Sequence, residues 1–158
     1  MKYVFIINPN SGKKELKDSL LNDLEKYKEK LDYEIYISKK EKDATLYVDD
    51  YCKKNKEDII FVACGGDGTI NEVVNGAINH RNAIVTCYPC GSGNDFVKIY
   101  GGKEKFLNLE NILSGIETKI DVMKVNDKYA VNVTNFGYDA EVCDIANKVR
   151  RKKIIFRW

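Results

Sequence analysis

The stretch CGGDGTINEVVNG, residues 64–76, places one carboxylate among glycines directly after an apolar run. Gly65 and Gly66 can adopt backbone angles that are closed to other residues, so their amides can approach a phosphate without side-chain obstruction. Thr69 supplies a hydroxyl that would cap a helix beginning near Asn71, and the positive end of that helix favours an anion. The stretch therefore indicates a phosphate-binding loop.

Asp67 is the exceptional member of this loop, because a carboxylate repels phosphate unless a cation lies between them. Its presence predicts that Asp67 reaches Mg²⁺, directly or through water, or polarises an acceptor hydroxyl. A purely structural alternative stays open, in which the stretch is a tight strand-to-helix turn and Asp67 accepts hydrogen bonds from its own loop amides.

Two further glycine-rich loops have the same character. In NPNSG, Asn8 ends an apolar run, Pro9 fixes a turn, and Ser11 with Gly12 offers a hydroxyl and open backbone. In PCGSGND, Ser92 lies between two glycines. Each loop alone is also a common turn, and the chain has neither the GxGxxG of a dinucleotide fold nor a GxxxxGK[ST] P-loop. A nucleotide site here would therefore be of another kind.

The elements between these loops alternate between strand and helix patterns. Short β-branched or aromatic runs predict strands, and apolar residues at helical spacing predict helices, with Asp43 as the N-cap of the second. The expected strands are residues 3–8, 33–38, 58–66 and 83–89, and the expected helices are residues 16–31, 43–54, 70–78, a short one within 91–100, and 108–115.

This alternation predicts an α/β fold, an open parallel sheet with right-handed crossovers. In such sheets ligands bind beyond the carboxyl ends of the strands, where all three glycine-rich loops fall, so we expect the loops to converge. His80 lies in a loop at the opposite edge and is expected at the surface, away from any site. The sequence offers no Ser-His-Asp set around it.

The pattern changes after Gly115. Residues 118–125 and 128–137 alternate around Asn126 and Asp127, which predicts an antiparallel hairpin, and residues 139–153 read as a helix. We therefore expect two domains, residues 1–116 and an incomplete second domain, residues 117–158. The chain ends on the strand-like run IIFRW, which suggests a fragment.

Composition narrows the function classes. The net charge is +2, from 26 basic and 24 acidic residues in 158, which argues against a nucleic-acid binder. No apolar run is long enough to span a membrane. The five cysteines lack the partners of a zinc site, so we expect buried or half-buried thiols in a reducing cytosol. The basic tail KVRRKKIIFRW is either a solvated helix end or a contact for anionic lipid.

NPNSG, GGDGTINEVVNG and PCGSGNDF, in this order and spacing, resemble the diacylglycerol kinase catalytic domain family, and most closely its bacterial soluble lipid kinases. IDVMKVNDKYAVNVTNFGYDAEV also resembles the start of that family's second domain. The resemblance covers residues 3 to about 148, and NEVVNG favours lipid kinases over NAD kinases and phosphofructokinases, which share GGDG.

The resemblance implies a nucleotide-binding domain of NAD kinase and phosphofructokinase type, followed by a β-sandwich domain that is truncated here. It implies transfer of the γ-phosphoryl of ATP, with Mg²⁺, to a lipid hydroxyl bound between the domains. It also implies a set of nucleotide-binding residues, with Asp67 tied to metal and acceptor chemistry: Asn8, Pro9, Asn10, Ser11, Gly12, Ser38, Gly65, Gly66, Asp67, Gly68, Thr69, Ile70, Asn71 and Ser92.

The chain departs from the family in length, because the family's chains are about twice as long. No acid in residues 118–158 matches the family's metal-holding acid or its general base. We therefore expect it to bind nucleotide without turning over alone, and its open sheet edges predict homo-oligomers. The expected partners are ATP and a lipid, diacylglycerol by default, met peripherally at a membrane surface from the cytoplasm. Two alternatives remain: an NAD kinase-like enzyme acting on a soluble nucleotide, and a nucleotide-binding module without catalysis.

Overall fold

The computed structural model describes residues 1–151, and its centre is a parallel sheet of four strands. The strands are β1 (Lys2–Ile7), β2 (Tyr33–Ile37), β3 (Ile59–Gly65) and β4 (Ala83–Pro89), in the spatial order β2-β1-β3-β4. All three pairings are parallel. The predicted open α/β sheet is confirmed.

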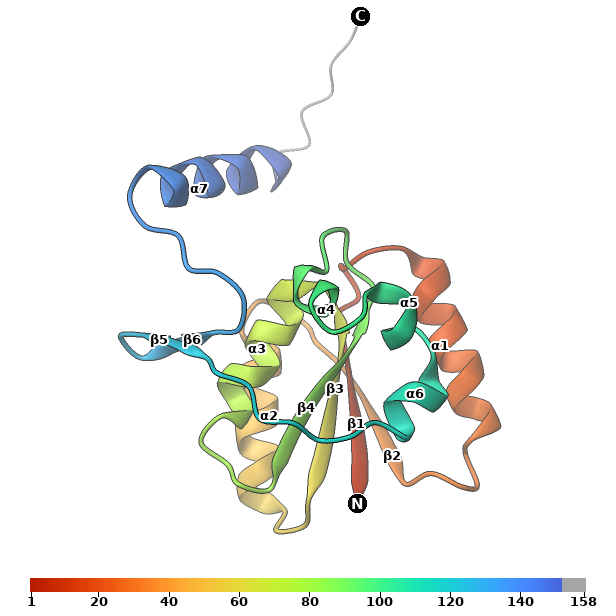
Figure 1. Ribbon diagram of the computed structural model, residues 1–158. Coiled ribbons are helices and arrows are strands. Elements are labelled where there is room, and N and C mark those ends of the chain that lie inside the picture. Colours follow the sequence, from red (N-terminus) through yellow and green to blue (C-terminus); the bar gives the residue numbers. More distant parts are fainter. Residues whose placement is uncertain (152–158) are drawn as a thin grey trace, which may run out of the picture.

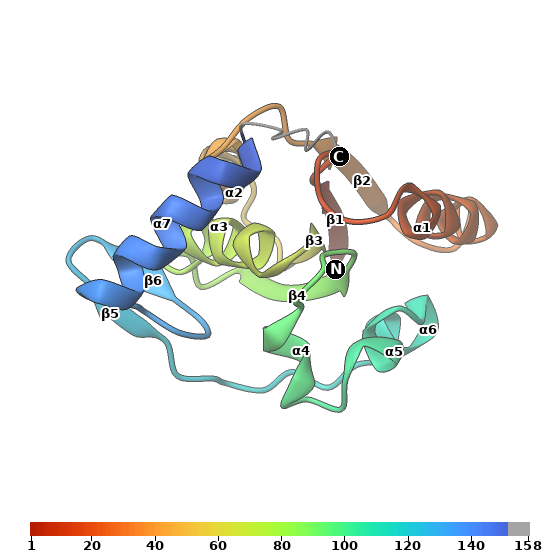
Figure 2. The ribbon, with the colours of Figure 1, turned by 90° about the horizontal axis from the view of Figure 1, so that it is seen from above.

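Helices cover both faces of the sheet (Figures 1 and 2). On one face lie α2 (Asp43–Lys54) and α3 (Asp67–Ala77); on the other lie α1 (Lys14–Lys26) and the short α5 (Lys103–Phe106) and α6 (Leu109–Leu113). Strand β1 shows why both faces need cover, because its side chains alternate between two apolar clusters. Val4 and Ile6 join the α2–α3 cluster, and Phe5 joins the α1 cluster; all three are fully buried.

Two helix starts differ from the expectation. Helix α3 begins at Asp67, four residues before Asn71, after Gly66 in extended conformation with no side-chain cap. Helix α2 follows Lys42, which has a left-handed backbone, so Asp43 is its first residue and not its N-cap. The Asp43 carboxylate instead accepts hydrogen bonds from the Lys39 amide and the Tyr36 hydroxyl. Both starts depend on backbone conformation, which the residue pattern does not reveal.

The region after α6 contains a hairpin and a helix. Strands β5 (Met123–Val125) and β6 (Lys128–Ala130) pair antiparallel, as predicted, but each is shorter than the alternating run. Helix α7 (Tyr138–Arg151) stands apart from the sheet (Figure 1). The short α4 (Asp95–Lys98) follows β4 as expected, whereas α5 was not anticipated. The IIFRW run lies outside the described residues, and the boundary near residue 117 stays a prediction.

Two expectations about single residues need correction. The His80 side chain is only 15% exposed, because its Nε2 lies 2.8 Å from an Asp49 carboxylate oxygen on α2. The prediction of a surface histidine is therefore wrong, although its position away from the glycine-rich loops is right. Cys143 is exposed on α7, whereas Cys52, Cys64, Cys87 and Cys90 are buried.

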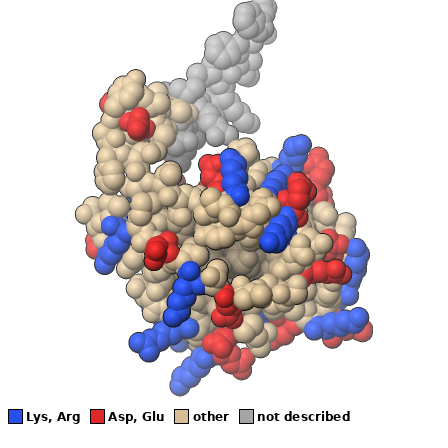
Figure 3. Space-filling view, in the orientation of Figure 1, with Lys and Arg blue, Asp and Glu red and all other residues tan. Residues whose placement is uncertain are grey.

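The surface carries interspersed basic and acidic side chains, with no large area of one sign on the face shown in Figure 3. Among the described residues, no helix is both long enough and apolar enough to cross a membrane.

Candidate nucleotide site

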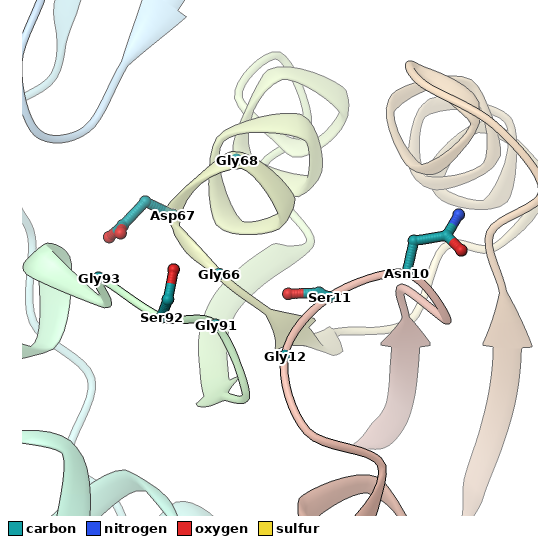
Figure 4. A pocket seen from close by; sticks show the side chains of 9 residues that line it. All are labelled: Asn10, Ser11, Gly12, Gly66, Asp67, Gly68, Gly91, Ser92 and Gly93. Atoms are coloured by element: carbon teal, nitrogen blue, oxygen red, sulfur yellow. The ribbon is translucent and has the colours of Figure 1, made fainter. Parts of the chain in front are cut away.

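The three glycine-rich loops meet at the carboxyl edge of the sheet and enclose a pocket of about 400 Å³. Ser11 points into the space between the loops, Ser92 points toward Asp67, and Asn10 points away (Figure 4). The predicted convergence is confirmed. The lining residues come from all three loops: Asn10, Ser11, Gly12, Gly66, Asp67, Gly68, Gly91, Ser92 and Gly93.

Close backbone contacts hold these loops together and explain two of the glycines. Gly12 has a φ of +64°, and a Cβ at this position would lie 1.4 Å from the carbonyl oxygen of Cys90. A Cβ on Gly91 would lie 2.5 Å from the Cα of Gly66. Side chains at either place would push the loops apart, so the glycines are required by the close approach of the backbones.

Hydrogen bonds fix the first loop against the second. The Asn8 carboxamide accepts from the Asn10 amide at 3.0 Å and donates to the Thr69 hydroxyl at 3.2 Å. Lys17 Nζ on α1 donates to the Pro9 carbonyl at 2.7 Å. Thr69 is thus not a helix cap: its buried hydroxyl receives the hydrogen bond from Asn8 and ties two loops together.

Asp67 occupies the first turn of α3 at the pocket wall, and its carboxylate is held from two directions. Oδ1 accepts from the Phe96 amide on α4 and from Asn132 Nδ2 in the segment after β6, each at 3.0 Å. Neither donor belongs to its own loop, which argues against the alternative of an aspartate that merely closes its own turn. The arrangement leaves Oδ2 on the side of Gly93, 3.3 Å from where a Gly93 Cβ would lie.

The oxygen donors at this point fit a magnesium ion. An Asp95 carboxylate oxygen also lies near Gly93, 3.6 Å from the same Cβ position, so two carboxylates flank that glycine. Mg²⁺ is usually held by one or two carboxylates together with water and substrate phosphates. Within residues 1–151 no group of three or more His, Cys, Asp or Glu side chains is placed to hold a metal.

Charges near the pocket are partly paired. Lys98 forms an ion pair with Asp95, and this hydrogen bond, aided by the charges of Asp95 and Asp67, raises the pKa of the lysine. Burial raises the pKa of the Cys90 thiol, although the positive charges of Lys17 and Lys103 oppose that shift. Burial also raises the pKa of Cys87 to about 12, so neither thiol is a nucleophile at neutral pH.

Several residues predicted for the site lie behind it. Ser38 is buried at the end of β2 and donates to the Ile7 carbonyl at 3.4 Å. Gly65 ends β3, where a Cβ would lie 2.2 Å from the Thr69 hydroxyl. Ile70 belongs to the apolar core under α3. The predicted residues that do not line the pocket are Asn8, Pro9, Ser38, Gly65, Thr69, Ile70 and Asn71.

The residue pattern also missed participants. Gly91 and Gly93 line the pocket, whereas the sequence predicted only Ser92, which lies between them, as a nucleotide-binding residue. Asn132, which holds Asp67, gave no local signal, because its partner lies far away in the chain. Asn75 belongs to the NEVVNG run, but its contact was not anticipated: its Nδ2 donates to the Tyr129 carbonyl at 2.8 Å and its Oδ1 accepts from the Tyr129 amide at 2.9 Å.

Comparison with known proteins identifies the class. The α/β sheet with its glycine-rich edge is the fold of bacterial diacylglycerol kinases. One crystal structure of a diacylglycerol kinase from Bacillus anthracis superposes with a TM-score of 0.67 over 92% of this chain and 52% of that chain, at 24% identity. A second structure from this organism, whose description also names a diacylglycerol kinase, has a TM-score of 0.65 and 26% identity, over 81% of this chain and 47% of its own.

Sequence comparison is more specific. The family profile described as "Diacylglycerol kinase catalytic domain" matches residues 2–125. The chain belongs to this family. The "Diacylglycerol kinase" of Staphylococcus aureus (strain MRSA252) is 36% identical over 141 residues, which are 87% of this chain and 44% of that protein. The protein of S. aureus strain Newman matches to the same extent. The chain thus spans less than half the length of these curated relatives.

Proposed function

We propose that this chain is the nucleotide-binding part of an ATP-dependent lipid kinase that phosphorylates diacylglycerol to phosphatidic acid. The observation that carries the proposal is the position of Asp67. Its carboxylate stands at the wall of a pocket otherwise lined by glycine backbone and small polar side chains, beside the start of α3. Open amides and a helix N-terminus suit phosphate groups, and a carboxylate beside them suits their cation.

The reaction moves one phosphoryl group. The acceptor hydroxyl oxygen forms a bond to the γ-phosphorus, the bond between that phosphorus and the β–γ bridging oxygen breaks, and ADP leaves while a base takes the hydroxyl proton. In this scheme the backbone around Gly12, Gly66 and Gly91 and the hydroxyls of Ser11 and Ser92 bind the phosphates. Asp67 either holds the cation, directly or through water, or orients the acceptor hydroxyl. Mg²⁺, when bound, neutralises charge on the phosphates.

The acceptor side of the reaction is not assigned to described residues. The family resemblance implies a general base for which no acid in residues 118–158 is a match. The chain covers 44% of the length of its S. aureus relative. We therefore expect nucleotide binding without turnover by this chain alone. The lipid would be met at a membrane surface from the cytoplasm. Association between chains is also proposed, because the open sheet edges of a truncated β-sandwich favour pairing with another chain.

Calorimetric titration of Mg²⁺-ADP into this chain tests the nucleotide assignment. We expect saturable binding that depends on Mg²⁺, and loss of that dependence in Asp67→Ala. Absence of saturable nucleotide binding would overturn the assignment of the loops, whereas saturable binding that is indifferent to Mg²⁺ and to Asp67 would overturn the role of Asp67 in holding the cation.

A chimera tests the acceptor. It would join this chain to the remaining half of the S. aureus relative and be supplied with ATP and either diacylglycerol vesicles or NAD⁺. Labelled phosphate in the lipid supports the kinase proposed here, whereas labelled NAD⁺ would support an NAD kinase-like enzyme. If nucleotide binds but neither acceptor is phosphorylated, and the intact S. aureus protein is active in the same assay, the non-catalytic module becomes the better account.

A further inference from the structure

A short segment that begins in β6 and continues into the bend after it, residues 129–132, lies against helix α3 and is fastened to it at both ends. At one end Asn75 makes the two hydrogen bonds with the Tyr129 backbone. At the other end Asn132 Nδ2 donates to Asp67 Oδ1 at 3.0 Å. Between them Val131 packs against the core cluster under α3. We call residues 129–132 the docking segment.

The spacing of these contacts is matched on the two sides. Asp67 and Asn75 are eight residues apart on α3 and so share a face, separated by about 12 Å along the axis. Tyr129 lies in β6 and Asn132 in the bend directly after it, so these residues, three apart in the chain, span at most about 10 Å. The side chains of Asn75 and Asn132 bridge the remaining distance, so both contacts form together, with the docking segment antiparallel to the helix. A shift of one residue at Tyr129 would move the Asn132 carboxamide away from the Asp67 carboxylate.

This geometry gives the docking segment control over the orientation of Asp67. Oδ1 is held by the Phe96 amide on one side and by Asn132 on the other, which directs Oδ2 toward Gly93 and the pocket. A single donor would leave the carboxylate free to turn about that one hydrogen bond. Outer partners of this kind orient metal-binding carboxylates and strengthen metal binding.

We propose that Asn132 is a positioning residue for Asp67, and that Asn75 sets the register that brings Asn132 there. Docking of a segment outside the three glycine-rich loops thereby tunes the affinity of the site for Mg²⁺-nucleotide. The consequence for nucleotide rests on the proposed function, whereas the consequence for the orientation of Asp67 does not.

Amide hydrogen exchange on the ligand-free chain tests the orientation. In Asn132→Ala, and in Asn132→Asp, which keeps the volume but replaces the donor by a second carboxylate, we expect the Phe96 amide to exchange about tenfold faster. The Tyr129 amide should be unaffected in both variants. In Asn75→Ala both amides should exchange faster. The control is Asn135→Ala, since Asn135 is exposed and, within the part of the chain that the structure describes, its side chain donates one hydrogen bond, to the Cys143 sulfur at 3.5 Å. Unchanged exchange at Phe96 in both Asn132 variants would overturn the proposal.

Calorimetry with ADP tests the functional consequence. For Asn132→Ala we expect binding about tenfold weaker in the presence of Mg²⁺ and changed less than about twofold in its absence. Equal weakening with and without Mg²⁺ would contradict a role through Asp67. If wild-type chain binds no Mg²⁺-ADP, the proposed function fails, and the exchange of Phe96 still decides whether Asn132 positions the carboxylate.

Discussion

Two regions of this molecule are held together by different forces. The sheet region, residues 2–113, encloses apolar clusters on both faces of four parallel strands, and side chains such as Phe5, Phe61 and Leu20 are fully buried. The distal region, residues 123–151, leaves large apolar side chains exposed, among them Phe136 at 69% and Tyr138 at 78%. It meets α3 through hydrogen bonds of Asn75 and Asn132 and through the partly buried Val131.

The difference separates two properties of the site. The positions of the three loops follow from the packing of the sheet, because each loop continues a buried strand. The orientation of Asp67 depends also on the distal region, because one of its two hydrogen-bond donors comes from there. The arrangement of the three loops and the orientation of the Asp67 carboxylate can therefore be changed separately.

Two phenylalanines give the largest contrast in stability. Phe61→Ala removes a fully buried ring from β3 and should lower the free energy of unfolding by about 3–5 kcal/mol. Phe136→Ala removes a ring that is 69% exposed and should change it by less than about 0.5 kcal/mol. Urea denaturation of both variants measures the difference. Comparable losses would mean that the distal region is packed as tightly as the sheet.

Two glycines with nearly equal backbone angles give the second contrast. Gly12 has a φ of +64° and no room for a Cβ, whereas Gly137 has a φ of +61° and nothing within 4 Å. Gly137→Ala should cost only the left-handed strain, about 1–2 kcal/mol. In Gly12→Ala the new Cβ would also overlap the Cys90 carbonyl, so the free energy of unfolding should fall by about 3 kcal/mol or more. An equal decrease in the urea midpoint of the two variants would show that the two loops move apart at little cost to make room for a side chain at Gly12.

The cysteines give a kinetic contrast. Cys143 is exposed on α7, while Cys64 and Cys87 are buried and burial raises their thiol pKa. A thiol reagent should modify Cys143 at once and the buried thiols roughly a hundredfold more slowly, since they react only when the sheet region opens. Mass spectrometry over time identifies the sites, and Cys143→Ser should remove the fast phase. Early modification of Cys87 would indicate a mobile sheet edge.

The smallest expected effect is an acid dependence within the sheet region. Hydrogen bonds from the Lys39 amide and the Tyr36 hydroxyl lower the pKa of Asp43. Because the folded pKa is depressed, the stability it contributes is present above the ordinary value, about 3.9, and is lost as the pH falls through the folded value. Asp43→Asn should therefore lower the urea midpoint at neutral pH, and the difference should shrink in acid.

A matched control is Asp50→Asn, because Asp50 is an exposed partner of Lys54 and surface pairs contribute little. Its urea midpoint should stay close to that of the wild type at both pH values. A difference for Asp43→Asn that is constant with pH would rule out the ionised carboxylate as the cause.

The sheet and the convergence of its loops were predictable because the signals are local. Apolar β-branched runs such as YVFII mark buried strands, and parallel strands bring their following loops to one edge. The start of α3 was misplaced because the helix begins directly after Gly66 and no capping side chain marks that start. The contacts of Asn75 and Asn132 were missed, although Asn75 belongs to the NEVVNG run, because each residue acts on a partner distant in sequence and no local pattern reveals such a partner.

The central claim is that the three loops form one nucleotide site, and mapping of amide chemical shifts on titration with Mg²⁺-ADP tests it most directly. We expect the largest changes at residues that line the pocket on all three loops, including Ser11, Gly12, Gly66, Gly68 and Ser92, and none around His80 at the opposite edge. Changes that cluster away from the loops, or their absence at saturating nucleotide, would contradict the claim.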